Sequence, residues 1–273
     1  MEETLIRKIK RVVANNFDSS FVFYDEFEQR YGFFAELTLK LAEFVGLSEG
    51  SSVLDLGCGS GVSAEVLTRE FGCEVVGIDL SEKMVAHGRK VINDPRIRLE
   101  VGDAAAPESV VGEKKFDSVV YNASIFIIPE AEKSLKRAVA CLKPGGSLGF
   151  SFYPELVADD GSNLFHIAFS RCNMPRPERQ VITSYREALS GLRDCCEELQ
   201  EGVYEKPFSE EFLVDFFSIP AQSASLFPRL DYKERRQKVE VLFATLRPEA
   251  EGAKIIWRLA AGWIKKRMSR HKL

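Results

Sequence analysis

The chain has 273 residues, of which 45% are hydrophobic and 29% charged, and its formal net charge is −4. These values are typical of a globular protein with a sizeable core and argue against wholesale disorder. The negative charge disfavours a nucleic-acid partner. No apolar run approaches the roughly 18–20 residues of a membrane-spanning helix, and the first residues do not resemble a secretion signal. We therefore expect a cytoplasmic protein with one core domain and insertions.

The six cysteines include no C-x-x-C pair, and no Cys/His cluster has the spacing of a zinc site. Cys195 and Cys196 are adjacent, but such residues are more often small buried side chains than a reactive pair. We expect a reduced protein without a bound metal.

Residues 2–47 are expected to be helical, because Leu5, Ile9 and Val12 recur at helical spacing. From Ser51 onward, short β-rich runs alternate with helical stretches. This alternation predicts an α/β fold with a doubly wound, mostly parallel sheet that helices cover on both faces. The expected strands are Ser52–Leu56, Glu74–Leu80, Ile97–Val101, Phe116–Asn122 and Ser147–Tyr153, and the expected helices span 61–71, 81–92 and 130–141.

The second half of the chain departs from this alternation. Residues 154–206 are rich in proline, arginine and acidic residues and are expected to form a helical insertion after the fifth strand. Residues 207–248 are expected to return to the core. The elements expected in these two segments are helical patches near 164–172 and 184–200, a helix over Ser209–Phe217, and strands over Ser223–Leu230 and Val239–Leu246.

The C-terminal segment has its own composition, with seven Lys/Arg and no acidic residue in 254–273. Ile256, Leu259 and Trp263 share one helical face, so residues 249–273 are expected to form a basic amphipathic helix. Three roles stay open: docking on the acidic body, a dimer contact, or peripheral contact with an anionic membrane. The oligomeric state is left open as well.

A glycine-rich turn follows the first expected strand, at Gly57, Gly59 and Gly61. Glycine lets the backbone turn sharply and approach a ligand closely. The spacing is G-x-G-x-G, whereas dinucleotide-binding folds use G-x-G-x-x-G. Asp55 lies two residues before the first glycine, where it would repel a pyrophosphate and attract an ammonium or sulfonium cation. The turn and Asp55 together favour a cationic ligand over a dinucleotide.

Two further acids end the next two expected strands. A carboxylate at Asp79 can accept hydrogen bonds from ribose hydroxyls. Asp103 and the backbone N–H that follows it suit an adenine edge. Because parallel strands end at the same edge of a sheet, Asp55, Asp79 and Asp103 are expected around one crevice. The sequence therefore predicts a nucleoside-containing ligand at that edge.

Several segments together resemble the class I S-adenosylmethionine-dependent methyltransferases: V-L-D-L-G-C-G-S-G, V-V-G-I-D-L-S-E-K-M, V-G-D-A, F-D-S-V-V-Y-N-A and L-K-P-G-G-S-L. The resemblance covers roughly residues 45–153 and 209–247. It implies a seven-stranded sheet whose last strand is antiparallel. It also implies that 1–47 form a helical lid, that 48–153 form the cofactor-binding core and that 154–206 lie on the side of the methyl acceptor.

The same resemblance assigns residues to S-adenosylmethionine. It implies Gly57, Gly59 and Gly61 under the methionine moiety, Asp79 on the ribose, Leu80 and Met84 beside the adenine, Asp103 and Ala104 at the adenine amino group, Asn122 facing the reacting centre, and Tyr24 over the cofactor carboxylate.

The methyl acceptor is approached by exclusion. The fourth expected strand ends Tyr121-Asn122-Ala123-Ser124, which matches neither the motif of amino-methylating nucleic-acid enzymes nor that of cytosine-C5 enzymes. The remaining prediction is in-line methyl transfer to a small acceptor that is apolar, or lipid- or quinone-like. The alternatives are an S-adenosylmethionine-binding protein without catalysis and an NAD(P)-dependent oxidoreductase.

Two residues are candidates for a general base, should the acceptor need one. Tyr153 ends the fifth expected strand, and His166 lies in the insertion, on a mainly apolar helix that favours a structural role for it over a catalytic one. The aromatic residues between Phe17 and Phe34 have two interpretations. They either pack a lid helix against the sheet or line an apolar acceptor pocket.

Overall fold

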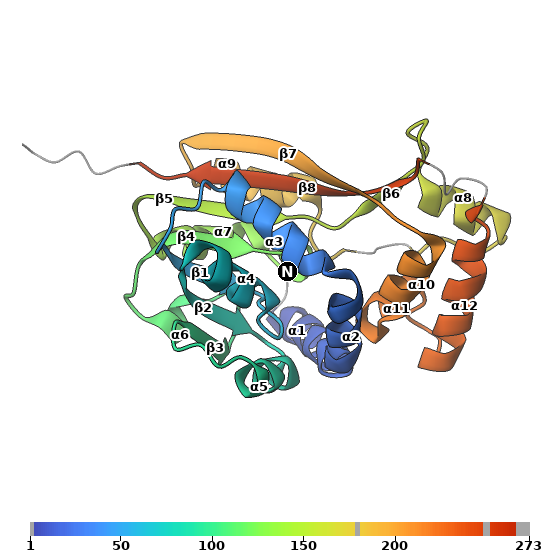
Figure 1. Cartoon of the computed structure of the whole chain (residues 1–273), viewed down its shortest axis with the longest axis horizontal. Coiled ribbons are helices and arrows are strands. Elements are labelled where there is room, and N and C mark those ends of the chain that lie inside the picture. The colour runs from blue at the N-terminus through green and yellow to red at the C-terminus, as the bar shows by residue number, and fades with distance from the viewer. Residues whose placement is uncertain (1–2, 178–180, 248–251, 266–273) are drawn as a thin grey trace, which may run out of the picture.

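A computed structural model describes residues 3–177, 181–247 and 252–265. Its centre is an eight-stranded sheet with the order β3-β2-β1-β4-β5-β8-β6, and β7 also pairs with β8 (Figure 1). Strands β1 to β5 are parallel, and β8 is antiparallel to β5, β6 and β7. The strands are β1 Ser52–Leu56, β2 Glu74–Asp79, β3 Ile97–Val101, β4 Phe116–Tyr121, β5 Leu142–Ser151, β6 Glu155–Val157, β7 Glu198–Pro207 and β8 Lys254–Trp263.

Helices cover both faces of the sheet, so the predicted α/β fold is confirmed, with eight strands in place of seven. On one face Val53 and Val75 pack with α3, α4 and α5, and on the other Leu54 and Val76 pack with α7 and α9. The helices are α1 Glu3–Asp18, α2 Phe21–Tyr31, α3 Phe33–Phe44, α4 Val62–Phe71, α5 Glu82–Val91, α6 Glu108–Val111, η1 Ile125–Ile127, α7 Ala131–Ala140, α8 Leu164–Arg171, α9 Tyr185–Arg193, α10 Glu210–Ser218, α11 Pro220–Leu226 and α12 Tyr232–Ala244.

The helices α1 and α2 lie beside α10, α11 and α12 at one end of the sheet (Figure 1). The predicted helical character of residues 2–47 is confirmed, since α1, α2 and α3 occupy nearly all of the described part. Within the described ranges, no helix is long and apolar enough to span a bilayer.

Two predicted strands are wrong. Residues 223–226 belong to α11, which Pro220 starts at the first helical position, and residues 227–230 form the turn that follows it. Residues 239–246 belong largely to α12, which begins at a capping box in which Asp231 and Glu234 bond each other's backbone N–H groups. The apolar run inside α12 alternates like a strand, but the capping signal before it sets a helical register.

The predicted C-terminal helix is also wrong for the described residues, because Lys254–Trp263 is strand β8. Ile255, Trp257 and Leu259 are buried while the residues between them are partly exposed, which is the two-residue period of a strand. A strand inside the sheet has no apolar helical face to place on a membrane, so the predicted membrane contact is withdrawn for this stretch. Residues 266–273, with most of the basic charge, lie outside the described residues.

The segment 154–206 is only partly the helical insertion that was predicted. It contains α8 and α9, but it also contains β6 and the ten-residue β7. Strand β7 pairs with β8 along its whole length, from Glu198 opposite Trp263 to Pro207 opposite Lys254. Neither strand has this partner nearby in sequence, so the pairing could not be predicted from local pattern.

Candidate cofactor and acceptor site

A cavity of about 560 Å³ opens where the parallel strands end, under α1 and α2 and beside α11. Its volume is within the range of small-molecule sites in proteins, and its wall is mostly apolar. The predicted site residues on its wall are Tyr24, Gly57, Gly59, Asp79, Leu80, Met84, Asp103, Ala104, Asn122 and Tyr153. Residues predicted from motifs far apart in the chain therefore meet around one space.

The glycine turn forms part of the cavity floor. Gly57 has φ +80°, and a Cβ there would lie 2.4 Å from Ser124 Cβ. Gly59 has φ +54°, and a Cβ there would meet no atom within 4 Å, so it would occupy open space beside the cavity. Gly61 differs: it starts α4, and its Cβ would collide with Ile92 and Leu99. Gly61 is therefore explained by packing, and it is absent from the described cavity wall.

Asp55 is fully buried next to the turn, and among the described residues neither carboxylate oxygen has a hydrogen-bond partner. Burial, and then the nearby charge of Asp79, raise the pKa of Asp55 to about 7. An unpaired buried carboxylate is costly unless a cation compensates it. The unpaired carboxylate of Asp55 thus suits a ligand with a positive charge at this turn, although Asp55 is not on the described cavity wall.

Asp79 links the glycine turn to the start of α5. Its Oδ2 accepts a hydrogen bond from Gly59 N at 2.9 Å, and its Oδ1 accepts one from Ser81 N at 2.8 Å. Burial raises the pKa of Asp79, and these two N–H groups oppose that rise. Each carboxylate oxygen can accept a second hydrogen bond. The side chain can therefore hold the turn and still bind hydroxyl groups in the cavity.

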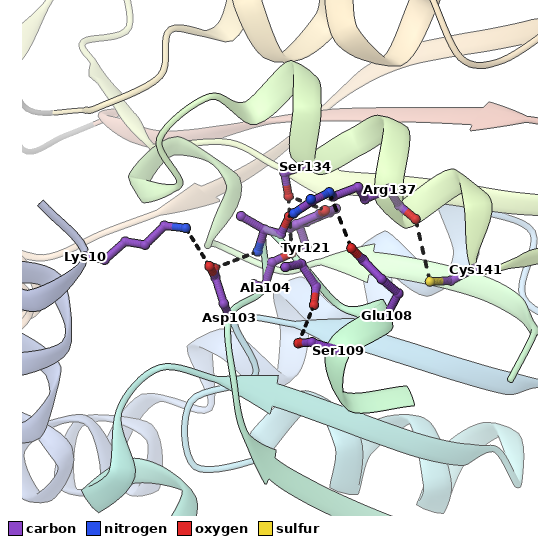
Figure 2. A network of polar contacts seen from close by, with 11 residues as sticks. Lys10, Asp103, Ala104, Glu108, Ser109, Tyr121, Ser134, Arg137 and Cys141 are labelled. Carbon is purple, nitrogen blue, oxygen red and sulfur yellow. Dashed lines mark hydrogen bonds and ion pairs between the residues drawn. The ribbon is translucent and has the colours of Figure 1, made fainter. Parts of the chain in front are cut away.

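Asp103 lies at the end of β3 and pairs with a residue from another part of the chain. Figure 2 shows Lys10 of α1 reaching Asp103, with which it forms an ion pair. The other carboxylate oxygen accepts a hydrogen bond from Ala105 N at 2.9 Å. The adjoining Ala104 carbonyl accepts a hydrogen bond from Ser134 of α7 at 3.2 Å. The loop that follows β3 is thus tied to both α1 and α7.

Asn122 lies at the end of β4 and is engaged on both sides of its amide. Its Nδ2 donates to Thr38 Oγ1 at 2.8 Å and to Ser63 Oγ at 3.1 Å. Its Oδ1 accepts from Ser151 Oγ at 2.7 Å. These bonds join α3, α4, β4 and β5 beside the cavity. The side-chain amide of Asn122 therefore holds the end of β4 in place.

Neutral polar side chains gather at another part of the wall. Gln222 of α11 donates to Tyr24 Oη at 2.9 Å, and the Tyr24 ring stacks on Phe17 with centroids 5.7 Å apart. Burial raises the pKa of Tyr24 and of Tyr153, and the Tyr153 hydroxyl has no hydrogen-bond partner among the described residues. Both phenols stay protonated near neutral pH. Tyr153 is thus placed at the cavity as a hydrogen-bond donor, and its use as a base is disfavoured.

The structure separates the other two predictions for the acceptor side. His166 is exposed on α8 and lies outside the described cavity wall, so it is not placed to act as a base there. Both interpretations of the aromatic segment hold, for different residues. Phe27 and Phe33 are buried in the core against α10, whereas Phe17 and Phe34 line the cavity.

Several residues of the cavity wall were not predicted. Glu28 is four residues after Tyr24 on α2, a spacing that places both on one helical face. Its carboxylate accepts hydrogen bonds from Phe34 N and Ala35 N, each at 2.8 Å, and burial raises its pKa. That helical spacing is the sequence signal that could have identified Glu28. Other residues of the wall with polar groups or large rings include Lys10, Phe126, Gln222, Ser225 and Trp257.

Comparison with known proteins agrees with this geometry. The sequence profile of the methyltransferase domain matches residues 53–146. Trans-aconitate 2-methyltransferase of Variovorax paradoxus is 39% identical over 107 residues, which cover 38% of this chain and 39% of that protein. Phosphoethanolamine N-methyltransferase 2 of Caenorhabditis elegans is 33% identical over 116 residues, or 41% of this chain and 26% of its own length. The matched segment is thus less than half of either relative.

Solved structures resemble the chain over a longer stretch. A putative sarcosine dimethylglycine methyltransferase from Galdieria sulphuraria covers 86% of this chain and 86% of its own, with a TM-score of 0.55 and 18% identity. A Haemonchus contortus phosphoethanolamine N-methyltransferase 2, bound to S-adenosylhomocysteine, covers 84% of this chain and 52% of its own, with a TM-score of 0.54 and 20% identity. At such identities the likeness shows the fold.

The fold and the cofactor-side geometry define a class I methyltransferase fold. Over residues 53–146 the chain is similar to the methyltransferase domain and to the methyltransferases named above.

Proposed function

We propose that this chain transfers the methyl group of S-adenosylmethionine to a small molecule with an apolar body and a neutral hydroxyl or amine group. The observation that supports S-adenosylmethionine as the methyl donor is the burial of Asp55 beside the glycine turn, where its carboxylate has no described hydrogen-bond partner. A sulfonium or ammonium cation compensates that charge, whereas the pyrophosphate of NAD(P) would be repelled. This disfavours an oxidoreductase.

The cavity wall supports an acceptor that is mainly apolar. The aromatic rings of Phe126, Tyr153 and Trp257 lie close together, with centroids of Phe126 and Tyr153 5.2 Å apart. The described basic residues on the wall are Lys8 and Lys10, and Lys10 is paired with Asp103. A di- or tricarboxylate or a phosphate acceptor would need more cationic partners than this. A neutral polar group can instead bind Tyr153 or Gln222.

The chain's own residues account for the rest of the reaction. When bound, S-adenosylmethionine supplies an electrophilic methyl group on its sulfonium. Gly59 would leave space for its methionine part beside Gly57, which packs against Ser124, and Asp79 would accept hydrogen bonds from its ribose. Tyr153 donates a hydrogen bond that orients the acceptor. Glu28 accepts the proton that a hydroxyl or amine loses, because its raised pKa brings it nearer to neutral pH. The apolar wall excludes water and positions the two reactants.

A transfer assay with labelled methyl donor tests this function. The panel contains neutral phenols and amines with apolar bodies, together with a tricarboxylate and a phosphate ester. We expect labelled product from the neutral compounds and little from the anions. Gly59→Ala is the donor-site control, and Gly46→Ala is its matched partner, since Gly46 also has positive φ, at +68°, and open space around it. Product from the anions alone would overturn the proposed acceptor class, and donor binding without any product would favour a non-catalytic role.

A further inference from the structure

Helix α1 lines the cavity without being anchored by burial. None of its 16 residues is buried. Leu5 and Val12 are on the cavity wall, yet they are 47% and 51% exposed. An amphipathic helix gains most of its stability from packing its apolar face, and this face is only partly covered, by contacts with α5 and α11 and by the stacking of Phe17 on Tyr24. The position of α1 therefore depends strongly on its polar contacts until a ligand fills the cavity.

Polar contacts attach α1 to the core at two described points. At its C-terminal end, Asp18 accepts hydrogen bonds from Ser81 Oγ at 2.6 Å and from Lys83 N at 3.1 Å. Two turns earlier, Lys10 pairs with Asp103. The side chains of this pair are only 24% and 29% exposed, so salt screens them less than a surface pair. The first contact fixes one end of α1, and the second holds its middle over the cavity.

Asp103 is a fixed partner for Lys10. Arg137 of α7 donates to the Ala105 carbonyl at 3.2 Å, and Ser134 donates to the Ala104 carbonyl, so α7 holds the loop after β3 (Figure 2). A carboxylate offers about four acceptor positions. Lys10 and Ala105 N occupy one each. Asp103 can therefore bind Lys10 and a nucleoside amino group at the same time.

We propose that Lys10 is a positioning residue: by pairing with Asp103 it holds α1 closed over the adenosine end of the bound donor and slows the release of the donor product. The same carboxylate is then shared between the helix and the ligand, which couples closure of α1 to occupancy of the site. The inference rests on the proposed function for the identity of the ligand. It does not depend on the acceptor.

Dissociation of S-adenosylhomocysteine from the full chain tests the pair. Stopped-flow competition would compare the wild type with Lys10→Met, Lys10→Arg and Arg11→Met. Arg11 is exposed on the same helix and lies outside the described cavity wall. Arg11→Met therefore removes one positive charge from α1, as Lys10→Met does, without touching the pair with Asp103. We expect Lys10→Met to dissociate about fivefold faster, as the loss of one part-buried pair implies. Lys10→Arg should restore the slow rate, and Arg11→Met should leave it unchanged.

Hydrogen exchange on the ligand-free chain supplies a second measurement. The backbone amides of α1 should exchange faster in Lys10→Met than in the wild type or in Arg11→Met. An unchanged or slower dissociation rate in Lys10→Met would overturn the inference, because Lys10 would then not hold the helix or would compete with the ligand. If the wild type bound neither S-adenosylmethionine nor S-adenosylhomocysteine, the proposed function would fail instead, and the exchange rates would still decide whether Lys10 holds α1.

Discussion

Strands β1 to β4 and strands β5 to β8, each with the residues that follow them, form two halves of one sheet, but their structures are encoded differently. In the first half, each strand is followed by residues on the cavity wall, and all the strands are parallel. In the second half, β8 lies between β7 on one edge and the consecutive strands β5 and β6 on the other. The first half therefore carries its site residues in short motifs at the strand ends, whereas the second half depends on antiparallel pairings with β8 that no such motif marks.

This contrast predicts that changes in the first half affect donor binding and that changes in the second half affect the acceptor alone. The largest effect is expected at Asp79. Asp79→Ala should weaken S-adenosylhomocysteine binding about a hundredfold, because charge-assisted hydrogen bonds to the turn and to the ligand are lost together. Calorimetric titration measures this.

Asp117→Ala is the matched control for Asp79→Ala. Asp117 also accepts a backbone hydrogen bond, from Ser52 N at 2.9 Å, but at the opposite edge of the sheet. The Asp117→Ala variant should be less stable than the wild type and should bind the ligand with the same affinity. Equal losses of affinity in both variants would show that general destabilisation explains the effect.

Glu28 tests whether the proton acceptor comes from the N-terminal helices. With a hydroxyl or amine acceptor, Glu28→Gln should lower kcat about a hundredfold, the usual effect of losing a general base. His166→Asn should leave kcat unchanged, since His166 is exposed on α8, away from the described cavity wall. A large loss of kcat in His166→Asn with none in Glu28→Gln would instead place the general base in the segment 154–206, as the sequence alone allowed.

Replacing Asp55 by Asn should have opposite effects on the stability of the protein and on its affinity for the ligand. The folded-state Asp55 pKa of about 7 lies above the value near 3.9 of an unfolded chain, so its ionisation lowers stability as the pH rises between the two. The stability of Asp55→Asn relative to the wild type should therefore improve by about 2–4 kcal/mol from pH 4 to pH 8. Denaturant unfolding at the two pH values measures this difference.

The same substitution should weaken binding of S-adenosylmethionine, by about tenfold at pH 8, because a buried anion near the cationic ligand is removed. Wild-type affinity should rise as the pH approaches 7 from below. A pH-independent affinity, or a variant that binds as well as the wild type, would remove Asp55 from the account of the donor site.

The smallest effect is expected on the acceptor side, at Tyr153. Tyr153→Phe should raise the KM of a neutral acceptor about fivefold through loss of one hydrogen bond, while the affinity for S-adenosylhomocysteine stays the same. Tyr185→Phe is a matched control, because Tyr185 bonds Glu201 and lies outside the described cavity wall. A loss of donor affinity in Tyr153→Phe would show that the two halves of the site are not separable in this way.

The first half of the fold could be predicted from sequence because its signals are local. Strands β1 to β4 were expected within one residue of their observed ends, and the acids at Asp79 and Asp103 follow directly from the strand ends. The later elements failed for different physical reasons. The pattern in 239–246 suits a strand as well as a helix, and only the capping box at Asp231 decides. Strand β8 was taken for a helix because its partners lie elsewhere in the chain.

The site divides in the same way. Gly57 and Asp79 were identified because their motif fixes their place, and the structure brings them to one cavity. Gln222 was missed because its segment was expected to be a strand. Lys10 was missed because no local pattern connects a helix at the start of the chain with Asp103 at the end of β3. His166 lies outside the described cavity wall, and only three-dimensional packing shows that its side of α8 is exposed.

The central claim is that the glycine turn with Asp55 and Asp79 binds S-adenosylmethionine. Calorimetric titration of the full chain with S-adenosylhomocysteine, S-adenosylmethionine and NAD tests it most directly. We expect saturable binding of both sulfur compounds at one site per chain and no heat from NAD. Saturable binding of NAD, with no response to either sulfur compound, would contradict the account.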